Sequence, residues 1–202
     1  MTILETRRLT LRLIAAEDAA FILKLLNEPS FLRFIGDRGV QNLDDARAYI
    51  ANGPAASYAR HGFGLWLAQL RDDGTPIGMC GLLKRDTLDD VDIGFALLPA
   101  YWGKGLAYEA AAAVMDYGQR ALGIPRIVAI VSPDNVASIR LLEKIGLVFD
   151  RRVDLNGDGR ETSLYVPAPT PGRQSRWRAM SAASGGIGGA EHRTRQKPWG
   201  GS

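Results

Sequence analysis

A glycine turn between an apolar run and an alanine-rich run holds the residues whose chemistry can be inferred most directly. Residues 99–110 read PAYWGKGLAYEA. The first amides of a helix have no intrahelical partner, and the helix dipole strengthens their attraction for phosphate. Because Gly103 and Gly105 have no Cβ, a bulky diphosphate can approach this backbone closely. The segment therefore predicts an anion-binding turn whose ligand is a phosphate-bearing cofactor.

Two common phosphate-binding motifs do not fit this turn. A Walker loop requires Gly-x-x-x-x-Gly-Lys-Ser/Thr, which the chain does not contain. A dinucleotide fingerprint requires Gly-x-Gly-x-x-Gly, and its third glycine position is occupied by Tyr108. A Gly-x-Gly turn alone is a weak signal, so the identity of the ligand depends on a second motif.

The second motif lies about thirty residues further along the chain, where residues 134–147 read DNVASIRLLEKIGL after the apolar run 126–131. Together the two motifs resemble those of the GNAT acetyltransferase superfamily. They are most similar to its ribosomal-protein N-acetyltransferase (RimJ/RimL-like) branch. The opening segment 5–12, ETRRLTLR, also looks like the first strand of that branch. The resemblance covers roughly residues 3–166 and keeps both motifs in the same order.

The resemblance implies an α+β (mixed α/β) fold, with a mostly antiparallel, twisted sheet of about six or seven strands and about four flanking helices. Apolar spacing and turn residues predict strands and helices that agree with it. We expect Pro29 to end the first helix, Asp44 to cap the second, and Gly53-Pro54 to end the second. The expected strands are 10–13, 63–70, 77–83, 92–98, 126–131, 147–155 and 162–166, and the expected helices are 16–27, 44–55, 107–121 and 136–145.

The resemblance also implies acetyl-CoA as co-substrate. Its pyrophosphate would bind the amides of the turn, its pantetheine arm would pair with the preceding strand, and Asn135 would contact it. Asn135 could instead be an Asx turn or a helix cap, and the Lys104 side chain could face solvent. The expected cofactor-binding residues are Phe95, Ala96, Leu97, Gly103, Lys104, Gly105, Leu106, Ala107, Tyr108 and Asn135.

The groups that would move protons are less clear from the sequence. The superfamily often has a tyrosine acid where this chain has Leu142, and some members have a glutamate base where it has Ile130. Ser138 matches a serine of the branch and could donate to the departing sulfur, or could simply bond to its own backbone. Asp92 could act as general base through water, or could be a solvated acid at the start of a strand.

The acceptor is expected to be a primary amine, of a small molecule or a protein N-terminus. Deprotonation at neutral pH costs roughly 4 kcal/mol for a lysine-like amine and about 0.5 kcal/mol for an α-amine. A site without an obvious strong base therefore favours an α-amine. Residues 28–41 and 156–160 are expected to form the entrance.

Composition and charge exclude several classes of function. Of the 202 residues, 46% are hydrophobic and 23% charged, which is typical of a globular domain. Residues 167–202 carry six basic side chains and one acidic one, whereas residues 1–166 carry 19 basic and 21 acidic ones. We therefore expect an acetyltransferase domain at 1–166, a basic, disordered tail at 167–202, and no nucleic-acid partner.

One cysteine and two histidines do not favour a zinc site or a disulfide framework, so no metal is expected. No apolar run is long enough to span a membrane, and the N-terminal segment does not resemble a signal peptide, which predicts a cytoplasmic protein without a membrane partner. A monomer or a homodimer would be compatible with these features. The second hypothesis is a non-catalytic acyl-CoA sensor or interaction module with the same fold, because the expected acid and base positions are apolar.

Overall fold

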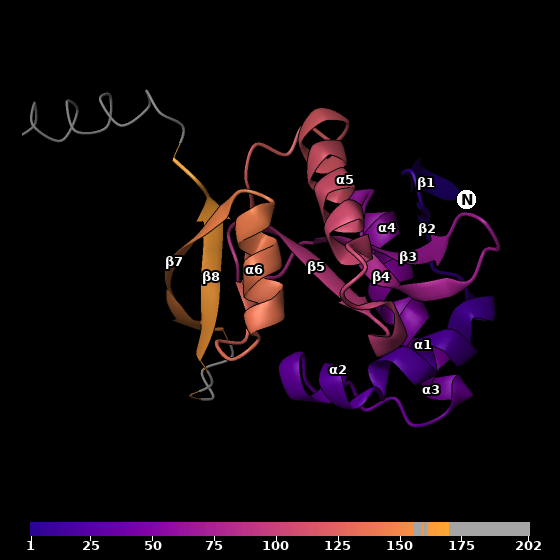
Figure 1. Cartoon of the computed structure of the whole chain (residues 1–202). Helices are drawn as coiled ribbons and strands as arrows, with labels where there is room; N and C mark the ends of the chain where they lie inside the picture. Colours follow the sequence, from indigo (N-terminus) through magenta and orange to yellow (C-terminus); the bar gives the residue numbers. More distant parts are fainter. Residues whose placement is uncertain (156–158, 160, 170–202) are drawn as a thin grey trace, which may run out of the picture. The chain divides into compact units, whose positions relative to one another are not determined.

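Eight strands in the described part of the chain form a single sheet. The structure, a computed structural model, describes residues 1–155, 159 and 161–169 (Figure 1). The strand order is β1-β2-β3-β4-β5-β6-β8-β7, and every neighbouring pair is antiparallel except β5 and β6. The strands are β1 (Thr2–Glu5), β2 (Leu9–Leu13), β3 (Leu65–Leu70), β4 (Pro76–Leu83), β5 (Val91–Leu97), β6 (Ile127–Val131), β7 (Leu147–Asp154) and β8 (Glu161–Pro167).

The parallel pair is the weak point of the sheet. β5 and β6 pair only at Val91 with Ile127 and at Asp92 with Val128. Beyond these residues the two strands separate, while β5 stays paired with β4 as far as Leu97. The last residues of β5 therefore have a sheet partner on one side only, which leaves an unpaired edge inside the sheet.

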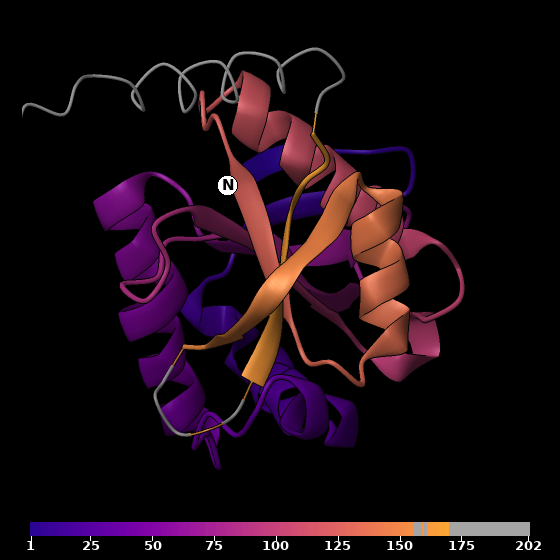
Figure 2. The same cartoon turned by 90° about the vertical axis from the view of Figure 1, so that its left-hand side faces the viewer.

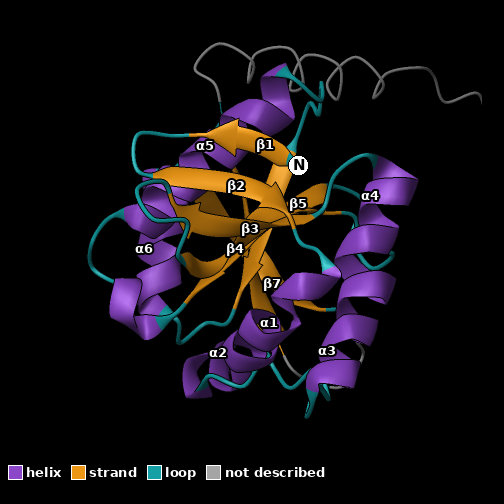
Figure 3. Cartoon of the chain, turned by 90° about the vertical axis from the view of Figure 1, so that its right-hand side faces the viewer, coloured by secondary structure: helices purple, strands orange, loops and turns teal. Residues whose placement is uncertain are grey.

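Two helical layers cover the two faces of the sheet (Figures 2 and 3). One layer contains α5 (Leu106–Arg120) and α6 (Val136–Lys144). The helix α5 approaches the sheet closely at Gly118, where a Cβ would lie 2.7 Å from Cδ1 of Ile127. The elements of the other layer are a 3-10 turn (Ala16–Asp18), α1 (Ala19–Leu26), α2 (Pro29–Phe34), α3 (Leu43–Ile50), a π-helical turn (Ala51–Ala55) and α4 (Ala56–His61).

The fold class expected from the sequence is confirmed, but three details of the N-terminal helices are wrong. Pro29 starts α2 and does not simply end the preceding helix, because proline is tolerated at the first helical position. The N-cap of α3 is Asn42, whose Oδ1 accepts from the amides of Asp44 and Asp45, both at 2.9 Å. Pro54 lies inside the π-helical turn, so the helix continues into α4.

The ends of the predicted domain also differ slightly from the structure. β1 was not expected, which explains why the described sheet has one strand more than the upper estimate. Pro167 belongs to β8, and the compact unit is Met1–Ala168. The tip predicted at 156–160 lies outside the described residues except for Gly159, and so does nearly all of the predicted tail at 167–202.

Candidate functional site

A cleft of about 650 Å³ lies where the α1–α2 segment, the end of β5, the glycine turn and α6 meet. It brings together most of the residues singled out from the sequence. Lys104 does not line it, and the Lys104 ammonium lies 5.4 Å from the centroid of the Tyr101 ring. Of the two predicted catalytic residues, Ser138 lines the cleft and Asp92 does not. The predicted cofactor-binding residues that line it are Phe95, Ala96, Leu97, Gly103, Gly105, Leu106, Ala107, Tyr108 and Asn135.

The unpaired edge of β5 forms one side of this cleft. The amide of Leu98 donates to the carbonyl of Ile77 at 2.9 Å, so the peptide group of Leu98 points towards β4. Successive peptide groups of a strand alternate in direction, so those of Leu97 and Phe95 point towards the gap beside β6. The Leu97 carbonyl accepts a hydrogen bond from Nε1 of Trp102 at 2.8 Å. This edge offers backbone donors and acceptors to an extended ligand.

The glycine turn presents a row of amides to the same cleft. Gly103 and Gly105 have φ angles of 72° and 73°, a left-handed conformation that glycine adopts without strain. Gly105 caps α5, and its carbonyl accepts the first intrahelical bond, from the amide of Glu109 at 3.0 Å. Within the described residues, the amides of 103–108 have no hydrogen-bond partner. They are therefore free to bind an anion, and nothing lies within 4 Å of the point where a Cβ would stand on Gly103.

Asn135 occupies both positions that its sequence context allows. Its Oδ1 accepts from the amide of Ser138 at 3.1 Å, which makes it the N-cap of α6. The same side chain lines the cleft, and its Nδ2 has no acceptor among the described residues. One amide group can therefore cap the helix through its oxygen and donate to a ligand through its nitrogen.

The two predicted catalytic residues lie in different environments. The hydroxyl of Ser138 makes no hydrogen bond with the described residues, so it is available to a ligand in the cleft. Asp92 is 1% exposed, and both of its carboxylate oxygens accept from Nε of Arg85, at 3.0 and 3.1 Å. Burial raises the pKa of Asp92, although Arg85 opposes this shift. The predicted acid position, Leu142, is a buried core residue.

Two groups of cleft residues were not identified from the sequence. The helix α2 contributes the apolar side chains of Phe31, Phe34 and Ile35. Their 3,4 spacing after a proline is typical of a short amphipathic helix and could have been recognised. Arg140 and Lys144 lie four residues apart on α6 and place two cations on the opposite wall.

Two side-chain contacts join the walls of the cleft. Arg33 of α2 forms an ion pair of 3.2 Å with Asp134, which precedes α6. The ammonium of Lys144 lies 4.5 Å from the centroid of the Tyr108 ring, a cation–π contact between α6 and the first turn of α5.

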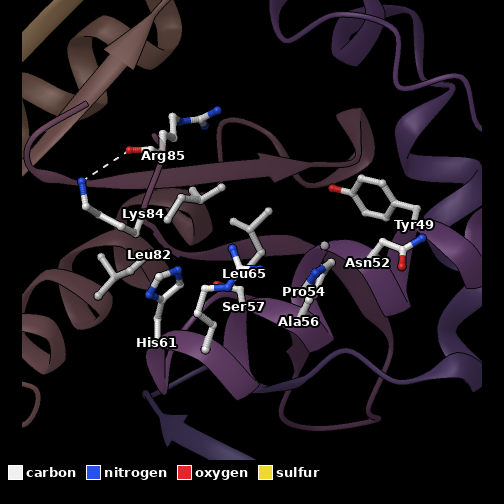
Figure 4. A pocket seen from close by; sticks show the side chains of 13 residues that line it. Tyr49, Asn52, Pro54, Ala56, Ser57, His61, Leu65, Leu82, Lys84 and Arg85 are labelled. Atoms are coloured by element: carbon white, nitrogen blue, oxygen red, sulfur yellow. Dashed lines mark hydrogen bonds between the residues drawn. The ribbon is translucent and has the colours of Figure 1, made fainter. Parts of the chain in front are cut away.

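A second, smaller cavity of about 250 Å³ lies between α3–α4 and the end of β4 (Figure 4). Its polar groups include His61, Ser57 and Tyr49. Beside it, Nζ of Lys84 donates to the carbonyl of Arg85 at 3.4 Å. None of the residues predicted to bind the cofactor lines this cavity, so the larger cleft is the candidate site.

The described residues include no helix that is long and apolar enough to cross a membrane. Within the same residues, His, Cys, Asp and Glu side chains do not form a group of three or more that could hold a metal ion.

Comparisons with known proteins agree with the geometry of the cleft. Residues 8–148 match the family described as acetyltransferase (GNAT) domain. An uncharacterized N-acetyltransferase of Bacillus subtilis (strain 168), YoaA, is 33% identical over 168 residues, covering 81% of this chain and 94% of the relative.

Solved structures show the same fold. An acetyltransferase from Agrobacterium tumefaciens str. C58 superposes with a TM-score of 0.71 at 27% identity, covering 84% of this chain and 95% of that chain. The ribosomal L7/L12 α-N-protein acetyltransferase RimL, in complex with coenzyme A, superposes with a TM-score of 0.69 at 18% identity, covering 82% and 97%. By its matched domain, its relatives and its fold, this chain belongs to the GNAT acetyltransferase family.

Proposed function

We propose that this protein transfers an acetyl group from acetyl-CoA to a primary amine by direct attack in a ternary complex. The observation that carries the proposal is a single cleft that combines the unpartnered amides of residues 103–108 with the unpaired edge of β5. The first group suits a diphosphate, and the second suits an extended, amide-containing arm. A ligand with both features is an acyl-coenzyme A.

The residues of the cleft fit such a ligand. The turn amides would hold the diphosphate, and the lack of side chains at Gly103 and Gly105 would let it come close. The Asn135 amide would donate to the arm that lies along Phe95, Ala96 and Leu97. Arg140 and Lys144 would add positive charge near the phosphates.

Acetyl-CoA would supply an acyl thioester, whose carbonyl becomes more negative as an amine attacks. The amide of Phe95 faces the gap beside β6 and would donate to that oxygen. A preorganised backbone donor of this kind is worth about 3 kcal/mol of the barrier. The chain's part in this step is to orient a fixed dipole.

Proton transfer is assigned to two residues as hypotheses. The free hydroxyl of Ser138 would donate to the departing sulfur, and Asp92 would accept the amine proton through water. Ser138→Ala should lower kcat by about 10²-fold without weakening CoA binding, as expected for loss of a positioned acid. Asp92→Asn should lower kcat similarly if the Asp92 hypothesis is right. Unchanged kcat in either variant would remove that residue from the mechanism.

The acceptor that we propose is a protein N-terminal amine, with small amines of low basicity as the next class. The proposal rests on the similarity to the RimJ/RimL-like branch and on the small cost, about 0.5 kcal/mol, of deprotonating an α-amine at neutral pH. We further propose a cytoplasmic protein, monomeric or homodimeric, without a nucleic-acid or membrane partner.

Calorimetric titration with acetyl-CoA tests the cofactor assignment, and absence of both heat and thermal stabilisation would contradict it. The acceptor is then identified with a panel of alanine- and serine-starting peptides, polyamines, aminoglycosides and amino acids. The proposed acceptor class predicts that an N-terminal peptide gives a higher kcat/KM than its N-blocked, lysine-containing counterpart.

A non-catalytic acyl-CoA sensor is the second candidate function. It is favoured by the apolar residues, Leu142 and Ile130, at the positions where the superfamily often carries its acid and base. Tight binding of acetyl-CoA without turnover of any amine in the panel would favour this candidate over the first.

A further inference from the structure

The carboxylate of Glu109, in the first turn of α5, joins this helix to the segment between β1 and β2. Its Oε1 accepts from Oγ1 of Thr6 at 2.6 Å and from the amide of Arg8 at 2.8 Å, and its Oε2 accepts from Nε of Arg8 at 2.6 Å. The Glu109 side chain is 17% exposed. Three hydrogen bonds to a largely buried carboxylate fix the position of the Arg8 guanidinium.

The guanidinium of Arg8 also binds the backbone of the glycine turn. Its Nη1 donates to the carbonyl of Lys104 at 3.0 Å. The carbonyl of Lys104 and the amide of Gly105 belong to one planar trans peptide, so they point in opposite directions. Because the carbonyl points towards Arg8, the amide of Gly105 must point away from Arg8.

This peptide needs an external contact to keep its orientation. It lies in the sequence Gly103-Lys104-Gly105, and both glycines have left-handed φ angles. Glycine adopts positive and negative φ about equally well, so the local backbone only weakly opposes a flip of the peptide. A flip would turn a carbonyl oxygen towards the side that the amide now faces, where it would repel a phosphate group.

We infer that Arg8, held by Glu109, is a positioning residue that keeps the Lys104–Gly105 peptide with its amide directed at the acyl-CoA diphosphate. The inference rests on the proposed function, because the anion is taken to be that diphosphate. The Arg8 guanidinium also brings positive charge to the turn, since its Nη2 lies 3.6 Å from the point where a Cβ would stand on Gly105. Arg8 stabilises the binding-competent turn and takes no part in the chemistry.

The test compares Arg8→Ala with Arg71→Ala, a matched control. Arg71 lies in the same region, pairs with Glu5 at 3.3 Å and donates to the Thr6 carbonyl at 3.2 Å, but does not contact the turn. Arg8→Ala should weaken CoA binding at least about tenfold, the effect of losing a hydrogen bond that involves a charged group. Arg71→Ala should bind CoA like the wild type.

A phosphate-free substrate separates positioning from general damage. S-acetyl-pantetheine lacks the diphosphate, so its kcat/KM should not change in Arg8→Ala. Arg8→Lys keeps the charge near Glu109 but cannot form the same fork, so it should fold normally and still lose part of the CoA affinity. The Gly105 amide resonance should shift in Arg8→Ala and should respond less to CoA.

Two results would overturn the inference while leaving the proposed function intact. One is wild-type CoA affinity in both Arg8 variants. The other is an equal loss for CoA and S-acetyl-pantetheine, which would indicate a structural role only. A wild-type protein that does not bind CoA would overturn the proposed function, and the inference with it.

Discussion

The Nε1–H of Trp102 donates to the carbonyl of Leu97 at 2.8 Å and so joins the start of the glycine turn to the end of β5. The two halves of the proposed acyl-CoA site, one for the diphosphate and one for the pantetheine arm, are therefore connected directly. The Trp102 side chain is 51% exposed, so its indole contributes mainly through this hydrogen bond.

Trp102→Phe should loosen this connection. The variant loses one hydrogen bond, worth about 1 kcal/mol of stability, and should bind acetyl-CoA several-fold more weakly. Urea unfolding and calorimetry measure the two effects. Tyr101→Phe is the control, because the Tyr101 hydroxyl makes no hydrogen bond with the described residues and its removal should leave both quantities unchanged.

Gly105→Glu should abolish acetyl-CoA binding and leave the fold largely intact. The added carboxylate repels the diphosphate, and a side chain is strained at a φ of 73°. Gly123→Glu is the matched control, since Gly123 has a φ of 65° with nothing within 4 Å of its Cβ position and does not line the cleft. The control should lose similar stability and keep its affinity. Equal affinity in the two variants would contradict the assignment of the turn.

Asn135→Asp should separate helix capping from cofactor binding. Aspartate is as good an N-cap as asparagine, so stability should be retained, but the Nδ2 donor is replaced by a charged oxygen. Asn135→Ala should lose about 1 kcal/mol of stability as well as affinity. If Asn135 is only a cap, the aspartate variant will bind acetyl-CoA as well as the wild type does.

The ion pair between Asp92 and Arg85 should make stability decrease as the pH rises. Burial raises the pKa of Asp92 despite the opposing effect of Arg85, so the folded protein holds this proton more tightly than the unfolded chain. The contribution is greatest below the unfolded pKa and is lost as the pH rises through the folded pKa. Asp92→Asn should therefore gain stability relative to the wild type between about pH 4 and about pH 7.

The ion pair between Asp18 and Arg12 should behave in the opposite way and serves as the control. Burial opposes the shift, but hydrogen bonds from Arg12 and from the amide of Ala15 lower the pKa of Asp18. Its contribution is present above the unfolded pKa and is lost as the pH falls through the folded pKa. Asp18→Asn should lose stability at neutral pH. Parallel pH profiles for the two variants would contradict both assignments.

Local features of this protein were predictable because their causes lie within a few residues. The left-handed glycines of the turn, the start of α5 after Gly105 and the cap at Asn135 depend on backbone conformation and on hydrogen bonds between near neighbours. Errors occurred where one residue type has two local uses. Pro29 was taken only as a stop, although proline also starts helices, and Pro54 was tolerated inside a π-helical turn.

The sequence by itself determined the fold class, the family and the order of the two motifs, because periodicity and turn residues are written along the chain. Only the tertiary structure decided that β5 separates from β6 after two paired residues, and that α2 supplies a wall of the cleft. It also decided that Arg8 meets Glu109 and the Lys104 carbonyl. These relationships join residues far apart in the chain, and they arise from the packing of whole strands and helices, which no local pattern records.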